Sequence, residues 1–406
     1  MPVKRVPATL LLVSLAARLA AAASRGWGSV RFGDSRAYIV AARKLVQSGT
    51  YPANTDGFFF RAPGYPFFLA ATTFGHPDWI FLDKLWNAAL GAGAVLLLWA
   101  IARRVFGSEG LALAVGAVAA VHPAFLFFGS QVQSEPLYVL LALFSGFFLL
   151  VCVDRPSSGM GLLAGGALAL AALVRPSALA LAPFLAAPLL DRRYPARVRR
   201  ALAGSAVLGF CAALSPWMLR NAIAFKTVLP VNDEAGFTFY QGNSDWNLRF
   251  YRLESREEYR RFDLSAASKW RSAIPGLDDP NPSRRSFALV RAALRWARAH
   301  PREEVWVLWK KVEDWLRPGA SPLVRKPSVV LATSVYYGAG FLLCAIGLAS
   351  ARRKGTALFC VSILGVTMAI HVAFLVLLRY RMASWDPILV LYSPAGALVL
   401  FSRFRR

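Results

Sequence analysis

Two short motifs near the start of the chain hold residue types that could do chemistry. Asp34 follows a first apolar segment and opens an amphipathic stretch that runs to Gln47. An Arg-x-Pro-Gly-Tyr-Pro motif at 61–66 then supplies Arg61 and Tyr65. A carboxylate can act as a general base, with a pKa raised by apolar helix ends, and a fixed arginine suits a phosphate. The alternatives are a helix N-cap for Asp34 and an ordinary loop for Arg61.

Two further charged residues stand at the ends of apolar segments. Glu135 lies in a short Ser-Glu-Pro turn, where an acid in the first turn of a helix also favours the helix dipole. Because that turn is short, we expect Glu135 to lie near the bilayer surface and to approach Asp34 in a common pocket. Arg175 separates two apolar runs, and it either belongs to a functional site or simply reaches the membrane surface.

The second half of the chain adds three more candidate groups. Arg220 follows a Pro-Trp pair that ends an apolar segment, and Arg379 and Arg381 flank Tyr380 at the end of another. Arg379 and Arg381 are predicted to hold a lipid phosphate or to anchor the helix end, and Arg220 is predicted to project at the depth of the lipid head groups. Gly242 and Asn243 end a stretch of glycines, aromatic residues and amides, which fits sugar contact but also any outer loop.

Long apolar runs dominate the chain and predict an all-α polytopic membrane protein. Of its 406 residues, 56% are hydrophobic, and about ten runs are long enough to cross a bilayer. The runs at 159–174 and 177–190 are short and could form one broken hairpin. The ten segments lie near 7–24, 81–102, 111–128, 136–153, 159–174, 177–190, 201–217, 329–349, 356–378 and 385–402.

The distribution of positive charge predicts which ends of the segments face the cytoplasm. The net charge is +25, but the cations are clustered between alternate apolar runs and do not form one soluble face, which argues against nucleic acid. With ten spans, every cluster falls on the cytoplasmic side, together with both termini. The first segment also resembles a signal peptide, and we favour an uncleaved anchor because further spans follow.

This topology divides the chain into three parts. Residues 1–217 form a transmembrane module whose first outer loop, 25–80, contains an amphipathic helix. Residues 218–328 form an outer loop region with short helices near 286–299 and 302–316, and 329–406 return to the membrane. The sequence contains neither a nucleotide-binding loop nor a dinucleotide fingerprint, which disfavours a nucleotide-driven pump.

Taken in order, these motifs resemble the GT-C superfamily of membrane glycosyltransferases. They are Asp34 with Tyr38, the 61–66 motif, Ser-Glu at 134–135, Arg-Pro at 175–176, Pro-Trp-x-x-Arg-Asn at 216–221, Gly-Asn at 242–243 and Arg-Tyr-Arg at 379–381. The branch that is most similar contains the bacterial proteins related to dolichyl-phosphate-mannose–protein mannosyltransferases and to the lipid A aminoarabinose transferase. The chain departs from that branch in having Arg61 in place of a lysine and Ser35 in place of a second acid.

The resemblance implies transfer of a hexosyl or pentosyl group from a polyprenyl-phosphate donor, outside the cytoplasmic (inner) membrane, to a lipid, glycan or protein acceptor. It implies Asp34 as the catalytic acid, with Glu135, Arg61 and Tyr65 on the acceptor side. Donor-phosphate contacts would come from Arg175, Arg220, Arg379 and Arg381, and sugar contacts from Tyr38, Gly242 and Asn243.

Two points stay open at the level of the sequence. Asp34 and Glu135 could together bind an optional Mg²⁺ or Mn²⁺ ion, although the resemblance does not require one. A transporter or flippase, and a polymerase that acts on lipid-linked glycans, are the alternative functions. The charged candidates cluster at one face of the membrane, which favours chemistry at that interface over transport through the midplane.

Overall fold

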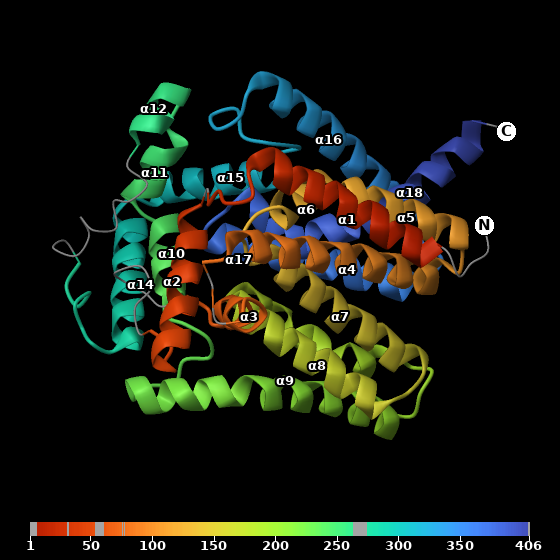
Figure 1. Ribbon diagram of the computed structural model, residues 1–406, viewed down its shortest axis with the longest axis horizontal. Coiled ribbons are helices and arrows are strands. Elements are labelled where there is room, and N and C mark those ends of the chain that lie inside the picture. The colour runs from red at the N-terminus through yellow and green to blue at the C-terminus, as the bar shows by residue number, and fades with distance from the viewer. Residues whose placement is uncertain are drawn as a thin grey trace.

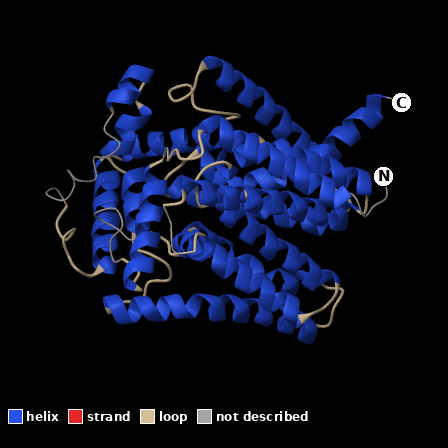
Figure 2. Cartoon of the chain, in the orientation of Figure 1, coloured by secondary structure: helices blue, strands red, loops and turns tan. Residues whose placement is uncertain are grey.

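The computed structural model describes residues 6–30, 32–52, 61–74, 76, 78–262 and 274–404. Within these ranges the regular structure is entirely helical (Figures 1 and 2). The long apolar helices run roughly side by side, and both chain termini lie at the same end of the bundle (Figure 1). The predicted all-α polytopic fold is therefore confirmed.

Seven helices in the described part of the chain are long and apolar enough to cross a membrane. An eighth span results if the bent pair α5 (Glu109–Val121) and α6 (Pro123–Gly129) is counted as one, whereas α8 (Ser158–Val174) and the 3-10 helix η1 (Pro176–Leu190) are shorter apolar helices. All ten predicted segments are helical, but length supports seven or eight spans. The seven are α1 (Val6–Arg25), α4 (Ile80–Phe106), α7 (Glu135–Asp154), α9 (Ala196–Phe225), α16 (Pro327–Ala349), α17 (Lys354–Ala373) and α18 (Trp385–Phe404).

Glycine allows the apolar helices to approach one another closely. A Cβ atom on Gly165 of α8 would lie 1.8 Å from the carbonyl oxygen of Ala206 on α9, and one on Gly396 of α18 would lie 1.9 Å from that of Leu343 on α16. The hydrophobic effect does not drive helices together in lipid, so their association depends on close van der Waals contact, which small residues at the crossings permit. These two crossings join α8 to α9 and α16 to α18.

One buried arginine stabilises the bend between α5 and α6. Pro123 begins α6 and cannot donate a backbone hydrogen bond, so carbonyl groups near the end of α5 lose their helical partners. Arg18 of α1 is fully buried beside Gly91 and Gly129 and donates to the carbonyl oxygen of Ala120 at 3.4 Å. It also donates to the carbonyl oxygen of Ser14 at 3.0 Å, so its charge is buried among backbone acceptors.

A layer of shorter helices covers the end of the bundle opposite the termini, and α2, α10 and α14 in it run across the direction of the spanning helices (Figure 1). The predicted helices of the first loop and of the 218–328 region are thus confirmed. The layer consists of α2 (Gly33–Ser48), α3 (Gly64–Thr72), α10 (Glu234–Gly242), α11 (Asp245–Tyr251), α12 (Arg256–Arg261), α14 (Pro282–Ala299), α15 (Pro301–Leu316) and the 3-10 helix η2 (Leu378–Ala383).

The start of α2 differs from the N-cap alternative. The N-cap residue is Phe32, and Asp34 lies in the first helical turn, where its carboxylate is free to face other elements. Tyr38, Ala41 and Ala42 are buried on one face of α2, whereas Leu45, which we expected on the same face, is partly exposed.

Candidate functional site

Asp34 lies between two arginines that come from distant parts of the chain. Its Oδ1 atom accepts a hydrogen bond from Arg61 at 2.9 Å, and its Oδ2 atom lies 2.8 Å from a guanidinium nitrogen of Arg379. The three side chains are each about one-fifth exposed. The segment after the first apolar helix and the Arg-Tyr-Arg segment therefore meet at the end of the bundle opposite the termini.

This contact is part of a longer series of alternating charges. Arg379 also lies 3.8 Å from Glu135, and Glu135 forms an ion pair with Arg175 at 2.8 Å. At the other end, Arg61 pairs with Glu234 of α10 at 2.7 Å. We call the six residues the acid–arginine series; in order they are Glu234, Arg61, Asp34, Arg379, Glu135 and Arg175.

Close backbone packing fixes the position of Arg61. A Cβ atom on Gly64 would lie 2.8 Å from Cγ2 of Val174 and 2.9 Å from the carbonyl carbon of Leu173, so only glycine lets this turn rest on the end of α8. The hydroxyl of Tyr51 donates to the carbonyl oxygen of Arg61 at 2.9 Å. Arg61 and Arg175, which follows α8, are thus held at one level of the bundle.

The arginines keep Asp34 ionised. Burial raises the pKa of Asp34, but the charges of Arg379 and Arg61 outweigh burial and hold the pKa at about 2. The raised pKa that we expected for a general base is therefore wrong for this state of the protein. Burial opposes the charge of Arg379 as well, yet Asp34 and Glu135 raise its pKa above the ordinary value.

Tyr380 joins the two arginines at the Glu135 end of the series. Arg175 and Arg379 lie 5.2 Å and 5.7 Å from the centre of its ring, distances at which a cation is attracted to an aromatic face. The ring of Tyr380 stacks in turn on His371 at 4.8 Å. His371 is therefore packed behind the site and is not a member of the series.

The structure places the two predicted tyrosines beneath the series. The hydroxyl of Tyr38 lies 3.2 Å from the Oγ atom of Ser134, next to Glu135. Tyr65 is fully buried, and its hydroxyl accepts a hydrogen bond from Asn87 at 2.8 Å. Both rings support the site from the protein interior, and their contact with a substrate stays a prediction.

Two of the predicted phosphate-binding arginines face elsewhere. Arg220 donates to the carbonyl oxygen of Tyr51 at 2.8 Å, so it touches the site only through the residue that holds Arg61. Arg381 is buried and donates to the carbonyl oxygens of Trp315 and Arg317 at the end of α15, at 3.1 and 2.9 Å. The structure does not bring either side chain into the series.

Gly242 and Asn243 also have structural contacts. A Cβ atom on Gly242 would lie 1.6 Å from the carbonyl oxygen of Phe374, so α10 ends directly against the end of α17. Asn243 is buried and accepts a hydrogen bond from Lys311 at 2.7 Å. These residues join the outer layer to the bundle, and the predicted sugar contact is untested.

In this state of the protein, Arg379 occupies the position that a divalent ion shared by Asp34 and Glu135 would need. Among the described residues, no group of three or more His, Cys, Asp or Glu side chains could hold a metal. Asp34 and Glu135 are both in contact with Arg379, so an ion placed between them would have to displace that cation.

Glu234 is the member of the series that the sequence does not reveal. It opens α10, and its neighbour Asp233 pairs with Arg285 of α14 at 2.7 Å. Nothing in the Asn-Asp-Glu stretch at 232–234 separates a site residue from an ordinary helix start. Its role arises from the tertiary fold, which brings α10 over Arg61.

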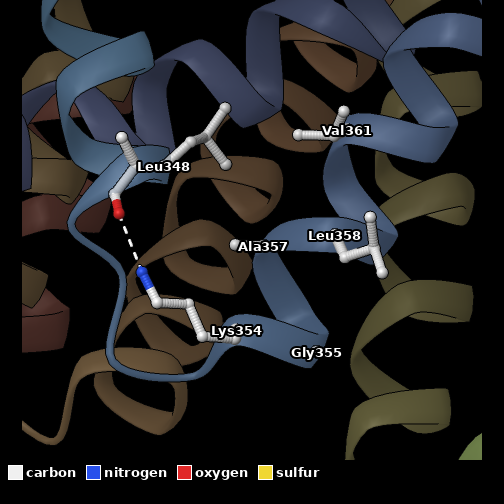
Figure 3. A pocket seen from close by; sticks show the side chains of 7 residues that line it. Leu348, Lys354, Gly355, Ala357, Leu358 and Val361 are labelled. Carbon is white, nitrogen blue, oxygen red and sulfur yellow. Dashed lines mark hydrogen bonds between the residues drawn. The ribbon is translucent and has the colours of Figure 1, made fainter.

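A separate hollow lies near the opposite end of the bundle (Figure 3). It lies between the end of α16 and the start of α17, where Lys354 donates to the carbonyl oxygen of Ala349 at 2.8 Å. Its lining is largely apolar and includes none of the predicted site residues. The lining residues are Leu348, Ala349, Lys354, Gly355, Ala357, Leu358 and Val361.

Part of the chain matches a known family of membrane glycosyltransferases. Residues 61–219 match the family described as dolichyl-phosphate-mannose-protein mannosyltransferase, which is less than half of the chain. No curated protein matches the sequence. The family match confirms the predicted resemblance to this branch of membrane glycosyltransferases over that segment, and the archaeal structures described next have a similar fold.

The oligosaccharyltransferase of Archaeoglobus fulgidus has a similar fold. The structure tethered to an acceptor peptide aligns with a TM-score of 0.57 and 13% identity, over 99% of this chain and 50% of that one. The oligosaccharyltransferase AglB from the same organism, in complex with an inhibitory peptide and a dolichol-phosphate, aligns with a TM-score of 0.53 and 13% identity, over 98% and 51% of the two chains. The present chain thus spans about half the length of that enzyme.

ArnT from Cupriavidus metallidurans, solved with undecaprenyl phosphate, has a TM-score of 0.46 and 15% identity, over 98% of this chain and 77% of that one. That score is too low to establish a shared fold.

Proposed function

We propose that the protein transfers a sugar from a polyprenyl-phosphate-linked donor to an acceptor at the outer face of the cytoplasmic membrane. The observation that carries this proposal is the position of Asp34 between Arg61 and Arg379. A carboxylate held between two cations offers an acceptor for a proton and, once the pairs open, two cations for a phosphate. The family match over 61–219 supports this class of donor. A dolichol-phosphate is bound in the archaeal enzyme of similar fold.

The proposed reaction is a direct displacement with inversion at the anomeric carbon. The acceptor hydroxyl oxygen forms the new bond to that carbon while the bond from carbon to the phosphate oxygen breaks. The departing phosphate keeps the bonding electron pair, and Asp34 takes the proton of the hydroxyl. Cations stabilise the growing negative charge on the phosphate, and removal of one such group typically slows the reaction about 10²–10³-fold.

Donor binding would also change Asp34 itself. The donor phosphate competes with the carboxylates for Arg379, which contacts both Asp34 and Glu135. Loss of that ion pair lets burial raise the pKa of Asp34, which makes the carboxylate a stronger base only when the donor is present. Glu135 would then remain paired with Arg175.

A transfer assay tests this proposal. Purified protein in nanodiscs would receive radiolabelled polyprenyl-phosphate sugars and an envelope extract as acceptor, with and without EDTA. We expect wild-type protein to release polyprenyl phosphate and to label the acceptor, and Asp34→Asn to bind the donor without transfer. Transfer by Asp34→Asn at the wild-type rate would refute the role of Asp34.

The alternative functions have a distinct outcome in the same assay. A flippase would move the labelled donor across the bilayer without releasing polyprenyl phosphate. A polymerase would require a diphosphate-linked glycan as its donor. Either result would replace the proposed reaction.

A further inference from the structure

One face of α14 carries a row of basic side chains that the proposed reaction does not use. Arg291, Arg295 and Arg298 follow one another at helical spacing on the exposed side of the helix. Within the described part of the chain, no carboxylate pairs with any of these three arginines. Phe287 and Leu294 lie on the same side and are 66% and 41% exposed. We call this surface the α14 basic face.

The opposite side of α14 packs against α10 and defines the direction of the basic face. Ala288, Leu289 and Ala293 are buried there, and Ser286 accepts a hydrogen bond from the backbone nitrogen of Gly236 at 3.0 Å. Because the buried side of α14 packs on α10, the helix that carries Glu234 of the acid–arginine series, the exposed arginines point away from the bundle. A bilayer surface is therefore a poor partner for them, and a ligand arriving from the aqueous side is a better one.

A surface hollow adjoins the basic face. Arg284, Phe287 and Arg291 line it together with Gly276 and Asp279. Asp279 lies 3.7 Å from Arg284, a weak exposed pair that leaves Arg291 without a carboxylate. An exposed aromatic ring between two guanidinium groups can stack on a sugar while the arginines hold anionic substituents.

The basic face is connected to the proposed reaction centre. Arg285, on the inner side of α14, pairs with Asp233 at 2.7 Å, and the next residue, Glu234, pairs with Arg61 of the acid–arginine series. A ligand bound along α14 would thus lie over α10, the helix whose Glu234 pairs with Arg61, the partner of Asp34.

From these observations we infer that the α14 basic face binds an anionic glycan, which is the acceptor of the transfer reaction. The charge of the face selects carboxylate or phosphate groups on the glycan, and Phe287 contacts its sugar rings. The assignment as acceptor rests on the proposed function, whereas the binding of an anionic glycan does not.

Binding of a defined probe tests the inference without turnover. Full-length protein in phosphatidylcholine nanodiscs would be titrated with hexagalacturonate and, separately, with the neutral maltohexaose. We expect the wild type to bind only the anionic oligosaccharide. The triple variant R291S/R295S/R298S should bind it about tenfold more weakly and with a smaller dependence on salt, because three exposed cations are lost. Phe287→Ala should weaken the binding of hexagalacturonate more than the binding of inorganic polyphosphate, because only the first has sugar rings for Phe287 to contact.

A matched variant separates the face from net charge. R252S/R260S/R261S removes three exposed cations from α11–α12 and the residues that follow them, in the same outer layer, and should change the affinity less than about twofold. Equal loss in both triple variants, or no binding by the wild type, would overturn the inference. The inference would also be overturned if the three arginines of the basic face affected only the binding of phosphatidylglycerol in the nanodisc and not the binding of the oligosaccharide. The rate of donor hydrolysis without acceptor should be the same in both triple variants. This rate reports on the proposed reaction, so its failure can be distinguished from a failure of glycan binding.

Discussion

At the residue scale, the site depends on how one arginine is shared. Arg379 contacts both Asp34 and Glu135, although the three residues lie far apart in the sequence. Glu135 is almost completely buried, so its charge requires a partner of this kind. A ligand that draws Arg379 away would therefore affect both carboxylates at once.

Replacement of Arg379 and of Arg381 should have different consequences. Arg379→Gln removes a cation from the reaction centre, and we expect kcat/KM for transfer to fall about 10²–10³-fold. Arg381→Gln removes the donor to the carbonyl oxygens at the end of α15, and we expect chiefly a lower unfolding temperature. Kinetics and thermal unfolding of both variants in nanodiscs provide the comparison. A loss of stability without a loss of rate in Arg379→Gln would contradict this assignment.

The stability supplied by Asp34 should depend on pH. Burial raises its pKa, but the arginines hold it at about 2, below the ordinary value of 3.8. Because the pKa is lower in the folded state, the contribution is fully present above about pH 4 and is lost as the pH falls toward about 2. We expect the difference in unfolding temperature between wild type and Asp34→Asn to shrink over that range. A difference that is the same at about pH 7 and about pH 3 would rule out the ion pairs as its source.

At the scale of elements, the turn before α3 sets the distance between Arg61 and Arg175. The turn can lie against the end of α8 only because residue 64 has no side chain. A single methyl group at this position would move Arg61 away from both of its carboxylate partners.

Gly64→Ala should therefore destabilise the protein and reduce transfer. We expect a loss of about 1–3 kcal/mol in the free energy of unfolding, as for other overpacked sites, together with a lower kcat/KM. Gly33→Ala is the control, since a Cβ atom there meets no atom within 4 Å and its φ is ordinary. Denaturation and transfer assays on the two variants test this contrast, and equal effects would show that the close contact at residue 64 is unimportant.

The sequence predicts elements better than contacts between them. Apolar runs located every spanning helix, and the amphipathic stretch from Asp34 to Gln47 predicted α2. The short turn before α7 predicted that Glu135 would lie near Asp34, and the two acids do share a contact with Arg379. In contrast, Arg379 and Arg381 look equivalent in the sequence, and only the 3-10 turn of η2 directs them to different partners. Glu234 and Arg18 lie in stretches without any motif, so their contacts required the tertiary structure.

At the scale of the whole molecule, the chain has two chemically different ends. The acid–arginine series and the α14 basic face lie at the end formed by the outer layer. At the other end, Asp154 pairs with Arg104 at 3.0 Å and with Arg353 at 3.1 Å, among the basic clusters that the positive-inside rule assigns to the cytoplasm. The orientation of the chain in the membrane thus decides where the proposed reaction occurs.

Thiol labelling of intact cells tests that orientation. In a Cys211→Ser background the three remaining cysteines are buried, so an introduced cysteine reports its own side of the membrane. We expect Arg295→Cys on α14 to react with a membrane-impermeant maleimide, and Arg352→Cys to react only after the cells are permeabilised. The two positions are both exposed, so a difference between them reflects the membrane and not local burial. Labelling of Arg352→Cys in intact cells, with Arg295→Cys protected, would put Asp34 in the cytoplasm and require a donor and an acceptor from that compartment.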